Sequence, residues 1–89
     1  MAKHLTIRGR VQGVGYRQWM CSEALALGLS GWVRNRANGD VEAVVDGLAP
    51  LVDTLIERAH RGPRAAQVES VTVGEAEGTF TGFEWRPTE

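Results

Sequence analysis

Apolar and polar residues alternate near the start of the chain, and this pattern predicts a strand over residues 4–11. One face of that strand carries Leu5, Ile7 and Val11, and the other face carries polar or charged side chains, namely His4, Thr6, Arg8 and Arg10. Alternation of this kind is typical of a strand that is buried on one face only.

A hairpin is expected in the middle of the chain. Residues 29–36 form an extended stretch. Residues 40–46 alternate, with Val41, Ala43 and Val45 on one face and Glu42, Val44 and Asp46 on the other. Between them stands Asn38-Gly39, the strongest short hairpin signal, because both residues tolerate positive φ. The two stretches are therefore predicted to be neighbouring antiparallel strands.

Two segments have the periodicity of amphipathic helices. Residues 17–28 place Met20, Ala24 and Leu27 on one face, and Gly28 is suited to ending that helix. A second apolar stripe precedes Gly62-Pro63 and consists of Leu51, Val52, Leu55, Ile56 and Ala59. We expect both stripes to pack against a sheet.

The last third of the chain is expected to be extended. Residues 65–73 form one stretch, and the change of parity between Val68 and Val71 indicates a β-bulge or a partly irregular start of the strand. A short final strand is expected through Phe83 and Trp85.

The predicted order of elements is strand, helix, strand, strand, helix, strand. This βαββαβ order is the ferredoxin-like, or split βαβ, sandwich of the α+β class. We expect two helices on one face of a four-stranded antiparallel sheet, and a short fifth strand at the C-terminus. Residues 1–89 are expected to form a single domain, since a chain of 89 residues can build one core.

Composition favours a globular protein of the cytoplasm. Apolar residues make up 43% of the chain and charged residues 24%, which is ordinary for a globular domain. No apolar run approaches the length of a membrane span, and the first residues lack the apolar region of an export signal. The single cysteine, Cys21, can form no internal disulfide and has no partners with metal-ligand spacing.

Charge is distributed unevenly, although the net charge is only −1. Residues 1–36 carry six lysines and arginines against one glutamate, or +5, and residues 37–89 carry four arginines against ten carboxylates, or −6. A locally positive field in the first part would attract an anionic ligand. The chain as a whole lacks the basic footprint of a nucleic-acid-binding protein. The strands predicted over 4–11 and 40–46 also lack the aromatic residues that RNA-binding sheets use.

A glycine-rich stretch with the sequence GRVQGVGYR, from Gly9 to Arg17, joins the first strand to the first helix. Gly13 and Gly15 allow backbone conformations closed to other residues, and a tight turn before a helix directs several main-chain N–H groups into one concavity. The helix N-terminus adds partial positive charge, and Arg17 supplies a fixed fork of donors. These features favour a small anion such as a phosphoryl group, although a glycine-rich turn taken alone is more often only a turn.

The same stretch differs from two nucleotide-binding loops. No Gly-Lys-Ser/Thr follows it, so it is not a Walker loop. Gln18 occupies the place of the third glycine in the dinucleotide fingerprint, so it does not match that motif either.

Two long segments resemble the signatures of a known family. The sequence GRVQGVGYR, residues 9–17, is similar to the first signature of acylphosphatases, and GWVRNRANG, residues 31–39, is similar to the second. Further matches extend the resemblance over nearly the whole chain, at Ala24, Leu27, Gly47, Pro63, Val68, Val71, Phe83 and Trp85. The resemblance implies hydrolysis of acyl phosphates to a carboxylate and inorganic phosphate, with no metal and no organic cofactor.

The resemblance also implies roles for individual residues. Arg17 would bind the phosphate, and Asn35 would orient the attacking water. The main-chain N–H groups that would hold the phosphoryl oxygens belong to Gly13, Val14, Gly15, Tyr16 and Arg17. The expected partners are acyl phosphates, inorganic phosphate and other small anions; no nucleic acid, no membrane and no second subunit is expected. Many relatives carry a small hydroxyl residue after the asparagine, where this chain has Arg36, so the role of that position is open.

Simpler interpretations exist for each residue taken alone. Asn35 could be a turn residue at the end of a strand, and Tyr16 and Trp32 could serve only in packing. Cys21 is interpreted as a packing residue rather than a nucleophile, because no base accompanies it. Two hypotheses stay open: an acylphosphatase, and an acylphosphatase-like module that binds an anion or a partner without turnover.

Overall fold

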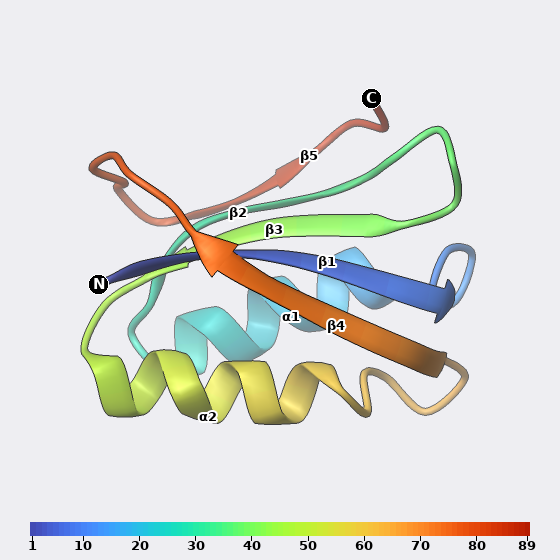
Figure 1. The fold of residues 1–89 in the computed structure, drawn as a ribbon, viewed down its shortest axis with the longest axis horizontal. Coiled ribbons are helices and arrows are strands. Elements are labelled where there is room, and N and C mark those ends of the chain that lie inside the picture. Colours follow the sequence, from blue (N-terminus) through green and yellow to red (C-terminus); the bar gives the residue numbers. More distant parts are fainter.

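The computed structural model describes all 89 residues as a five-stranded sheet with two helices on one of its faces (Figure 1). In chain order the elements are β1 (Ala2–Arg10), α1 (Tyr16–Ala26), β2 (Ser30–Asn35), β3 (Val41–Asp46), α2 (Ala49–Ala59), β4 (Gln67–Glu75) and β5 (Phe83–Arg86). The predicted ferredoxin-like βαββαβ sandwich is therefore confirmed, and so is the short fifth strand. No helix is long and apolar enough to cross a bilayer.

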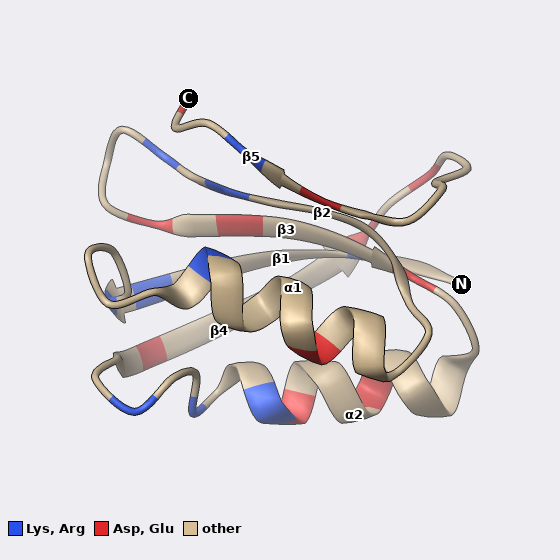
Figure 2. Ribbon diagram, turned by 180° about the vertical axis from the view of Figure 1, so that it is seen from behind, with Lys and Arg blue, Asp and Glu red and all other residues tan.

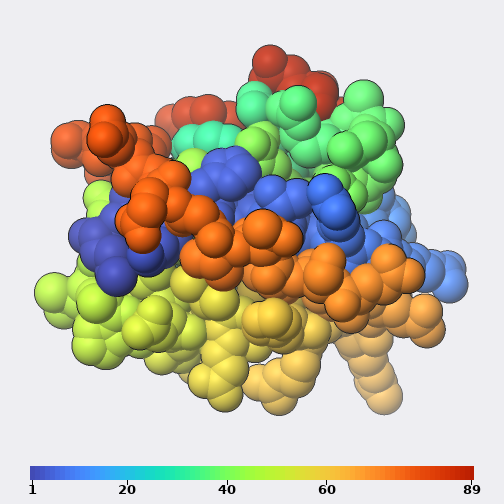
Figure 3. Space-filling view, in the orientation of Figure 1, coloured from blue at the N-terminus to red at the C-terminus, as the bar shows by residue number.

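The strand order in the sheet is β4-β1-β3-β2-β5. The first four strands pair antiparallel, but β5 pairs parallel with β2, so the complete sheet is mixed. In the space-filling view β1 (blue) lies beside β4 (orange), and the red C-terminal residues lie along the upper edge next to β2 (Figure 3).

Buried side chains from both layers form one core. On the sheet, Leu5 and Ile7 alternate with polar residues as predicted. On β3 the core residues are Val41, Ala43 and Val45, and Val44 on the opposite face is buried as well. The helices contribute Tyr16, Met20, Ala24, Val52, Leu55 and Ala59. Leu27, expected in the first helical stripe, is only partly buried, because α1 ends at Ala26 and Gly28 follows with a φ of 69°.

The predicted β-bulge lies on β4. Arg8 of β1 faces Ser70, but the next residue, Gly9, faces Val68, so Glu69 is an extra residue on the β4 side. The extra residue explains why Val68 and Val71, which differ in parity, are both partly buried against the core. The bulge therefore confirms an expectation drawn from parity alone.

The sheet topology brings the ends of three strands together. Strands β1 and β2 are both antiparallel to β3, and β5 is parallel to β2. Their last residues therefore lie at the same end of the sheet, where the loop after β1 leads into α1 (Figure 1). Residues that are distant in sequence, Arg17, Asn35 and Trp85, meet at this end.

Candidate active site

A cavity of about 150 Å³ opens at this end of the sheet. Its lining residues come from the loop after β1, the first turn of α1, the end of β2 and the end of β5: Val11, Gly13, Gly15, Tyr16, Arg17, Gln18, Asn35 and Trp85. The arginine and the asparagine of the two sequence signatures therefore face one small space.

The loop before α1 is shaped by two glycines. Gly13 has a φ of 71° and Gly15 a φ of 79°, both in the left-handed region that favours glycine. A Cβ added at either position would meet no atom within 4 Å, so the requirement is one of backbone conformation rather than of space. Gly15 is the N-cap of α1 and provides no side-chain cap.

The main-chain N–H groups around this turn have no acceptor within the protein. None of the backbone hydrogen bonds made outside helices and strands has an amide of residues 13–16 as its donor. The first N–H groups of α1 are also unpaired, as at any helix N-terminus. Together with the helix dipole, these donors make the turn suitable for an anion.

Arg17 is held at the cavity by two contacts with β5. Its Nη1 donates a hydrogen bond to the main-chain carbonyl oxygen of Arg86 at 3.1 Å. Its guanidinium also lies 4.8 Å from the centroid of the Trp85 ring, a distance typical of a cation–π contact. These contacts fix the side chain and leave most of its N–H donors without a protein partner.

The charge around Arg17 depends on ion pairs elsewhere in the sheet. Four other cations of residues 1–36 form ion pairs with carboxylates of residues 37–89. The pairs are Lys3–Glu75, Arg8–Asp40, Arg34–Glu42 and Arg36–Glu42. No carboxylate lies within ion-pair distance of Arg17. The excess of positive charge counted for residues 1–36 is therefore largely paired along the strands, because neighbouring strands bring opposite charges together (Figure 2). The positive charge that remains at the cavity is that of Arg17.

Asn35 is the last residue of β2 and is 8% exposed. Its main chain is fixed, because its carbonyl oxygen accepts a hydrogen bond from the N–H of Glu89 at 3.0 Å. Its side-chain carboxamide forms no hydrogen bond with another protein group and lines the cavity. A donor and an acceptor are thus available there for a small molecule such as water.

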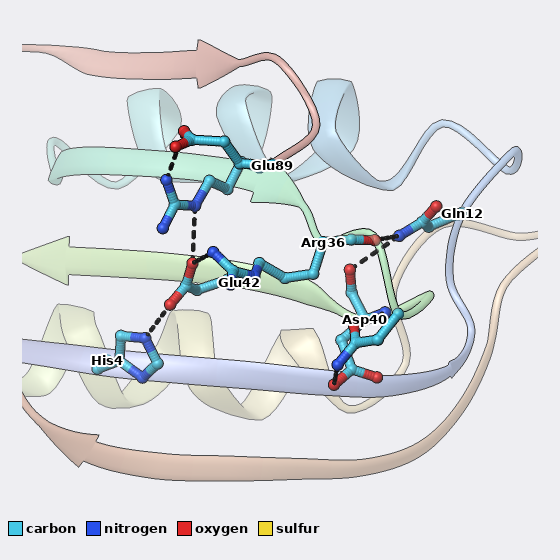
Figure 4. Close-up of polar contacts among 8 residues, drawn as sticks. His4, Gln12, Arg36, Asp40, Glu42 and Glu89 are labelled. Atoms are coloured by element: carbon cyan, nitrogen blue, oxygen red, sulfur yellow. Dashed lines mark hydrogen bonds and ion pairs between the residues drawn. The ribbon is translucent and has the colours of Figure 1, made fainter.

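Gln12 connects the two signatures. Its side-chain Nε2 donates hydrogen bonds to the carbonyl oxygens of Arg36 at 2.7 Å and Asp40 at 2.9 Å (Figure 4). The loop after β1 is thereby tied to the turn that follows Asn35. This bridge could not be predicted from the sequence, where Gln12 is marked only by its place in the first signature.

Arg36, where this chain departs from many relatives, is directed away from the cavity. Its Nη1 lies 3.4 Å from Oε1 of Glu42, on the face of the sheet opposite the helices (Figure 4). It is not among the residues that line the cavity. The structure therefore places this residue with the charged side chains of the sheet.

Glu42 is the centre of that charged group. It accepts hydrogen bonds from Arg34 at 2.7 Å and contacts Nε2 of His4 at 2.6 Å, and Arg34 also donates to Glu89 at 2.8 Å (Figure 4). Burial tends to raise the pKa of Glu42, but the hydrogen bonds from His4 and Arg34 outweigh it and lower the pKa. The hydrogen bond with Glu42 also raises the pKa of Arg34. The group joins three strands to the C-terminus.

Tyr16 and Val14 contribute side chains to packing. The Tyr16 ring is buried, its hydroxyl donates to the carbonyl oxygen of Ala59 at 2.6 Å, and burial raises the pKa of that hydroxyl. Tyr16 can therefore serve the cavity only through its main chain. Val14 packs against the core and is not among the lining residues.

Three lining residues were not among the predicted site residues: Val11, Gln18 and Trp85. Val11 and Gln18 flank the predicted loop, so their proximity could have been inferred from the loop alone. Trp85 depends on the parallel pairing of β5 with β2, which the pattern of apolar residues did not indicate.

Comparison with known proteins assigns the chain to a family. The family model for acylphosphatases matches residues 3–85. The chain belongs to the acylphosphatase family. An acylphosphatase of Acidovorax sp. (strain JS42) is 53% identical over 89 residues, which cover 99% of this chain and 92% of that protein. The family resemblance read from the two signatures is therefore confirmed.

Solved acylphosphatase structures share the fold. The acylphosphatase of Coxiella burnetii superposes with a TM-score of 0.92 at 36% identity, covering 96% of this chain and 90% of that one. The acylphosphatase of Bacillus subtilis superposes with a TM-score of 0.90 at 30% identity, covering 97% of this chain and 99% of that one.

Proposed function

We propose that this acylphosphatase cleaves the carboxyl–phosphate bond of acyl phosphates in the cavity beside Arg17, by in-line attack of water and without a metal or organic cofactor. One observation supports the proposal above all. An arginine without a carboxylate partner, a turn of unpaired N–H groups and a carboxamide without a protein partner line the same cavity of about 150 Å³.

Arg17 and the loop amides would bind the phosphoryl group. The guanidinium offers a planar fork that matches two phosphate oxygens, and the N–H groups of Gly13 to Arg17 would contact the others. In the transition state negative charge is spread over these oxygens. A fixed donor aimed at such charge contributes roughly 3–4 kcal/mol, so these groups would supply most of the electrostatic stabilisation.

Asn35 would position the attacking water. Its carboxamide can accept a hydrogen bond from the water and donate another, which fixes the direction of the oxygen lone pair. Holding a nucleophile in line can contribute up to about 7–11 kcal/mol in favourable cases. The fixed main chain of Asn35, bonded to Glu89, limits how far this side chain can move.

The leaving group places few demands on the site. The reaction breaks the bond between phosphorus and the acyl oxygen and forms a bond between phosphorus and the water oxygen. The acyl oxygen departs as a carboxylate, a weak base that needs no proton donor. The proton lost by the water passes to a phosphate oxygen, because no carboxylate or histidine lines the cavity.

The chain would act as a monomer in the cytoplasm. The unpaired Cys21 suits a reducing compartment.

Hydrolysis of benzoyl phosphate, followed by its loss of absorbance, tests this function. We expect turnover that an added chelator does not change, and competitive inhibition by inorganic phosphate. Phosphate binding without turnover would instead support the alternative, an anion-binding module of the same fold. Turnover that the chelator abolishes would contradict the metal-independent reaction.

A further inference from the structure

Trp85 is a large apolar side chain that remains 61% exposed at the end of β5. Besides lining the cavity beside Arg17, it lines two further hollows next to it. One hollow, of about 400 Å³, is bounded by Gln18, Cys21 and Trp85. An exposed indole that borders every hollow of the molecule indicates a binding role, because such rings contribute large apolar contact areas.

The hollow beside Cys21 adjoins the cavity at Arg17. Gln18 and Trp85 line both spaces. The lining is mainly apolar, and the Cys21 thiol remains neutral because burial raises its pKa. An uncharged group that emerges from the cavity would therefore meet an apolar surface at this point.

The position of the acyl group follows from the geometry of the substrate, if the phosphoryl group binds as in the proposed function. In an acyl phosphate a single oxygen joins the phosphorus to the acyl carbon. If the phosphoryl group binds at Arg17, the acyl group must lie at the rim of the cavity. The rim residues shared with the adjoining apolar hollow are Gln18 and Trp85.

We propose that Trp85, Gln18 and Cys21 form a subsite for the acyl group, and that this subsite selects apolar, above all aromatic, acyl phosphates. The indole would contact the acyl group, and Cys21 would form the floor of the hollow. Acyl groups too short to reach the ring, such as acetyl, would gain nothing from it.

The third hollow, which also borders Trp85, is less suitable. It is smaller, about 280 Å³, and is bounded by Arg17, Trp85, Arg86 and Pro87. There the Arg17 guanidinium covers part of the ring at 4.8 Å from its centroid. Arg17 is not among the residues that line the hollow beside Cys21, so the ring surface that faces Cys21 is free to contact a substrate.

The experiment compares benzoyl phosphate with acetyl phosphate in Trp85→Ala, Trp85→Phe and Cys21→Phe. Trp85→Ala should lower kcat/KM for benzoyl phosphate by roughly tenfold more than it lowers kcat/KM for acetyl phosphate, because both substrates lose the contact that holds Arg17 but only benzoyl phosphate loses the contact with the indole ring. Trp85→Phe should restore much of the preference. Cys21→Phe fills the hollow and should lower the benzoyl value selectively. Leu48→Ala, which removes another exposed apolar side chain at 72% exposure, serves as the control and should leave both values unchanged.

The outcomes separate this subsite from the proposed function. Equal losses with both substrates in Trp85→Ala, together with weaker inhibition by inorganic phosphate, would mean that Trp85 only positions Arg17, and the subsite would be wrong. If Trp85→Ala fails to fold, Cys21→Phe decides: an unchanged ratio of the two kcat/KM values overturns the subsite. A wild-type chain that hydrolyses neither substrate would overturn the proposed function itself, and the subsite with it.

Discussion

The side chain of Gln12 bridges two main-chain carbonyl oxygens of the turn after Asn35, those of Arg36 at 2.7 Å and Asp40 at 2.9 Å (Figure 4). Gln12 belongs to the loop that leads to Arg17. The bridge therefore sets the distance between the loop that would hold the phosphoryl group and the strand end that would hold the water. A catalytic arrangement built from two separate segments depends on such a connection, because positioning errors of about 1 Å can cost a hundredfold in rate.

Replacing Gln12 by leucine should reduce turnover without removing any group that contacts the substrate. We expect kcat to fall by roughly tenfold or more. The free energy of unfolding should fall by about 1–3 kcal/mol, because two hydrogen bonds worth about 0.5–1.5 kcal/mol each are lost, although both carbonyl oxygens keep a main-chain donor, the N–H of Gly39 for Arg36 and the N–H of Arg36 for Asp40. Steady-state kinetics and urea unfolding measure the two effects. Gln67→Leu, at an exposed glutamine on β4, is the matched control. Wild-type kcat in Gln12→Leu would show that the bridge does not position the site.

Arg17→Ala should lose both turnover and phosphate affinity. The guanidinium would be the main charged contact of the phosphoryl group, so we expect kcat/KM to fall by roughly 10²–10³-fold or more and inhibition by inorganic phosphate to weaken in parallel. Arg10→Ala is the matched control, since Arg10 is exposed, lies close in sequence and has no carboxylate partner. Similar losses in both variants would indicate a diffuse charge effect and argue against a specific contact at Arg17.

Asn35→Ala should separate turnover from binding. Its carboxamide would contact water rather than phosphate, so kcat should fall by about a hundredfold or more while the inhibition constant of inorganic phosphate stays near the wild-type value. Asn38→Ala, in the turn that follows β2, controls for a general disturbance of this region. Near-normal turnover in Asn35→Ala would rule out the water-orienting role.

Tyr16→Phe should affect stability and leave catalysis intact. The hydroxyl donates to the carbonyl oxygen of Ala59 inside the core, and its loss leaves that oxygen without this donor, at a cost of about 1–2 kcal/mol. The ring and the main-chain N–H group are retained, so kcat should be unchanged. Tyr16→Ala, in comparison, should cost roughly 3–5 kcal/mol because it leaves a cavity in the core. Lower kcat at full stability in Tyr16→Phe would show that the hydroxyl takes part in the reaction.

Much of the fold could be predicted because periodicity reports which face of an element is buried. The stripe through Met20 and Ala24, the hairpin at Asn38-Gly39 and the bulge between Val68 and Val71 all follow from local patterns. None of these patterns tells which strands are neighbours. The parallel pairing of β5 with β2, and with it the position of Trp85 at the cavity, therefore lay beyond the sequence.

The site could be predicted in part for a related reason. The two signatures indicated Arg17 and Asn35, and the topology brings both to one cavity. Which charged side chains form ion pairs could not be predicted, because pairs such as Arg34–Glu42 form between strands whose register is set by the whole sheet. Counting charges by segment indicated a basic surface, whereas pairing across strands leaves Arg17 as the charged group at the cavity.

Because the Glu42 carboxylate is bonded to His4 and Arg34, the free energy of unfolding should depend on pH in the acid range. The pKa of Glu42 is lowered in the folded chain, where His4 and Arg34 hydrogen-bond its carboxylate against the opposing effect of burial. A carboxyl group whose pKa is lowered by folding stabilises the fold above its unfolded pKa, and the stabilisation is lost as pH falls through the lower, folded value. Because the ordinary value is 4.5, the contribution should be complete at pH 7 and should disappear progressively below about pH 4.5.

Glu42→Gln tests this dependence directly. At pH 7 the variant should lose about 1–3 kcal/mol in free energy of unfolding, because charge-assisted hydrogen bonds are replaced by neutral ones. Urea unfolding should show the difference from wild type shrinking as the pH is lowered toward 3. Glu75→Gln is the control, since Glu75 is 79% exposed and pairs only with Lys3, where an ion pair contributes little. A difference that stays constant from pH 7 to pH 3 would mean that the Glu42 side chain stabilises the sheet by packing rather than by its charge.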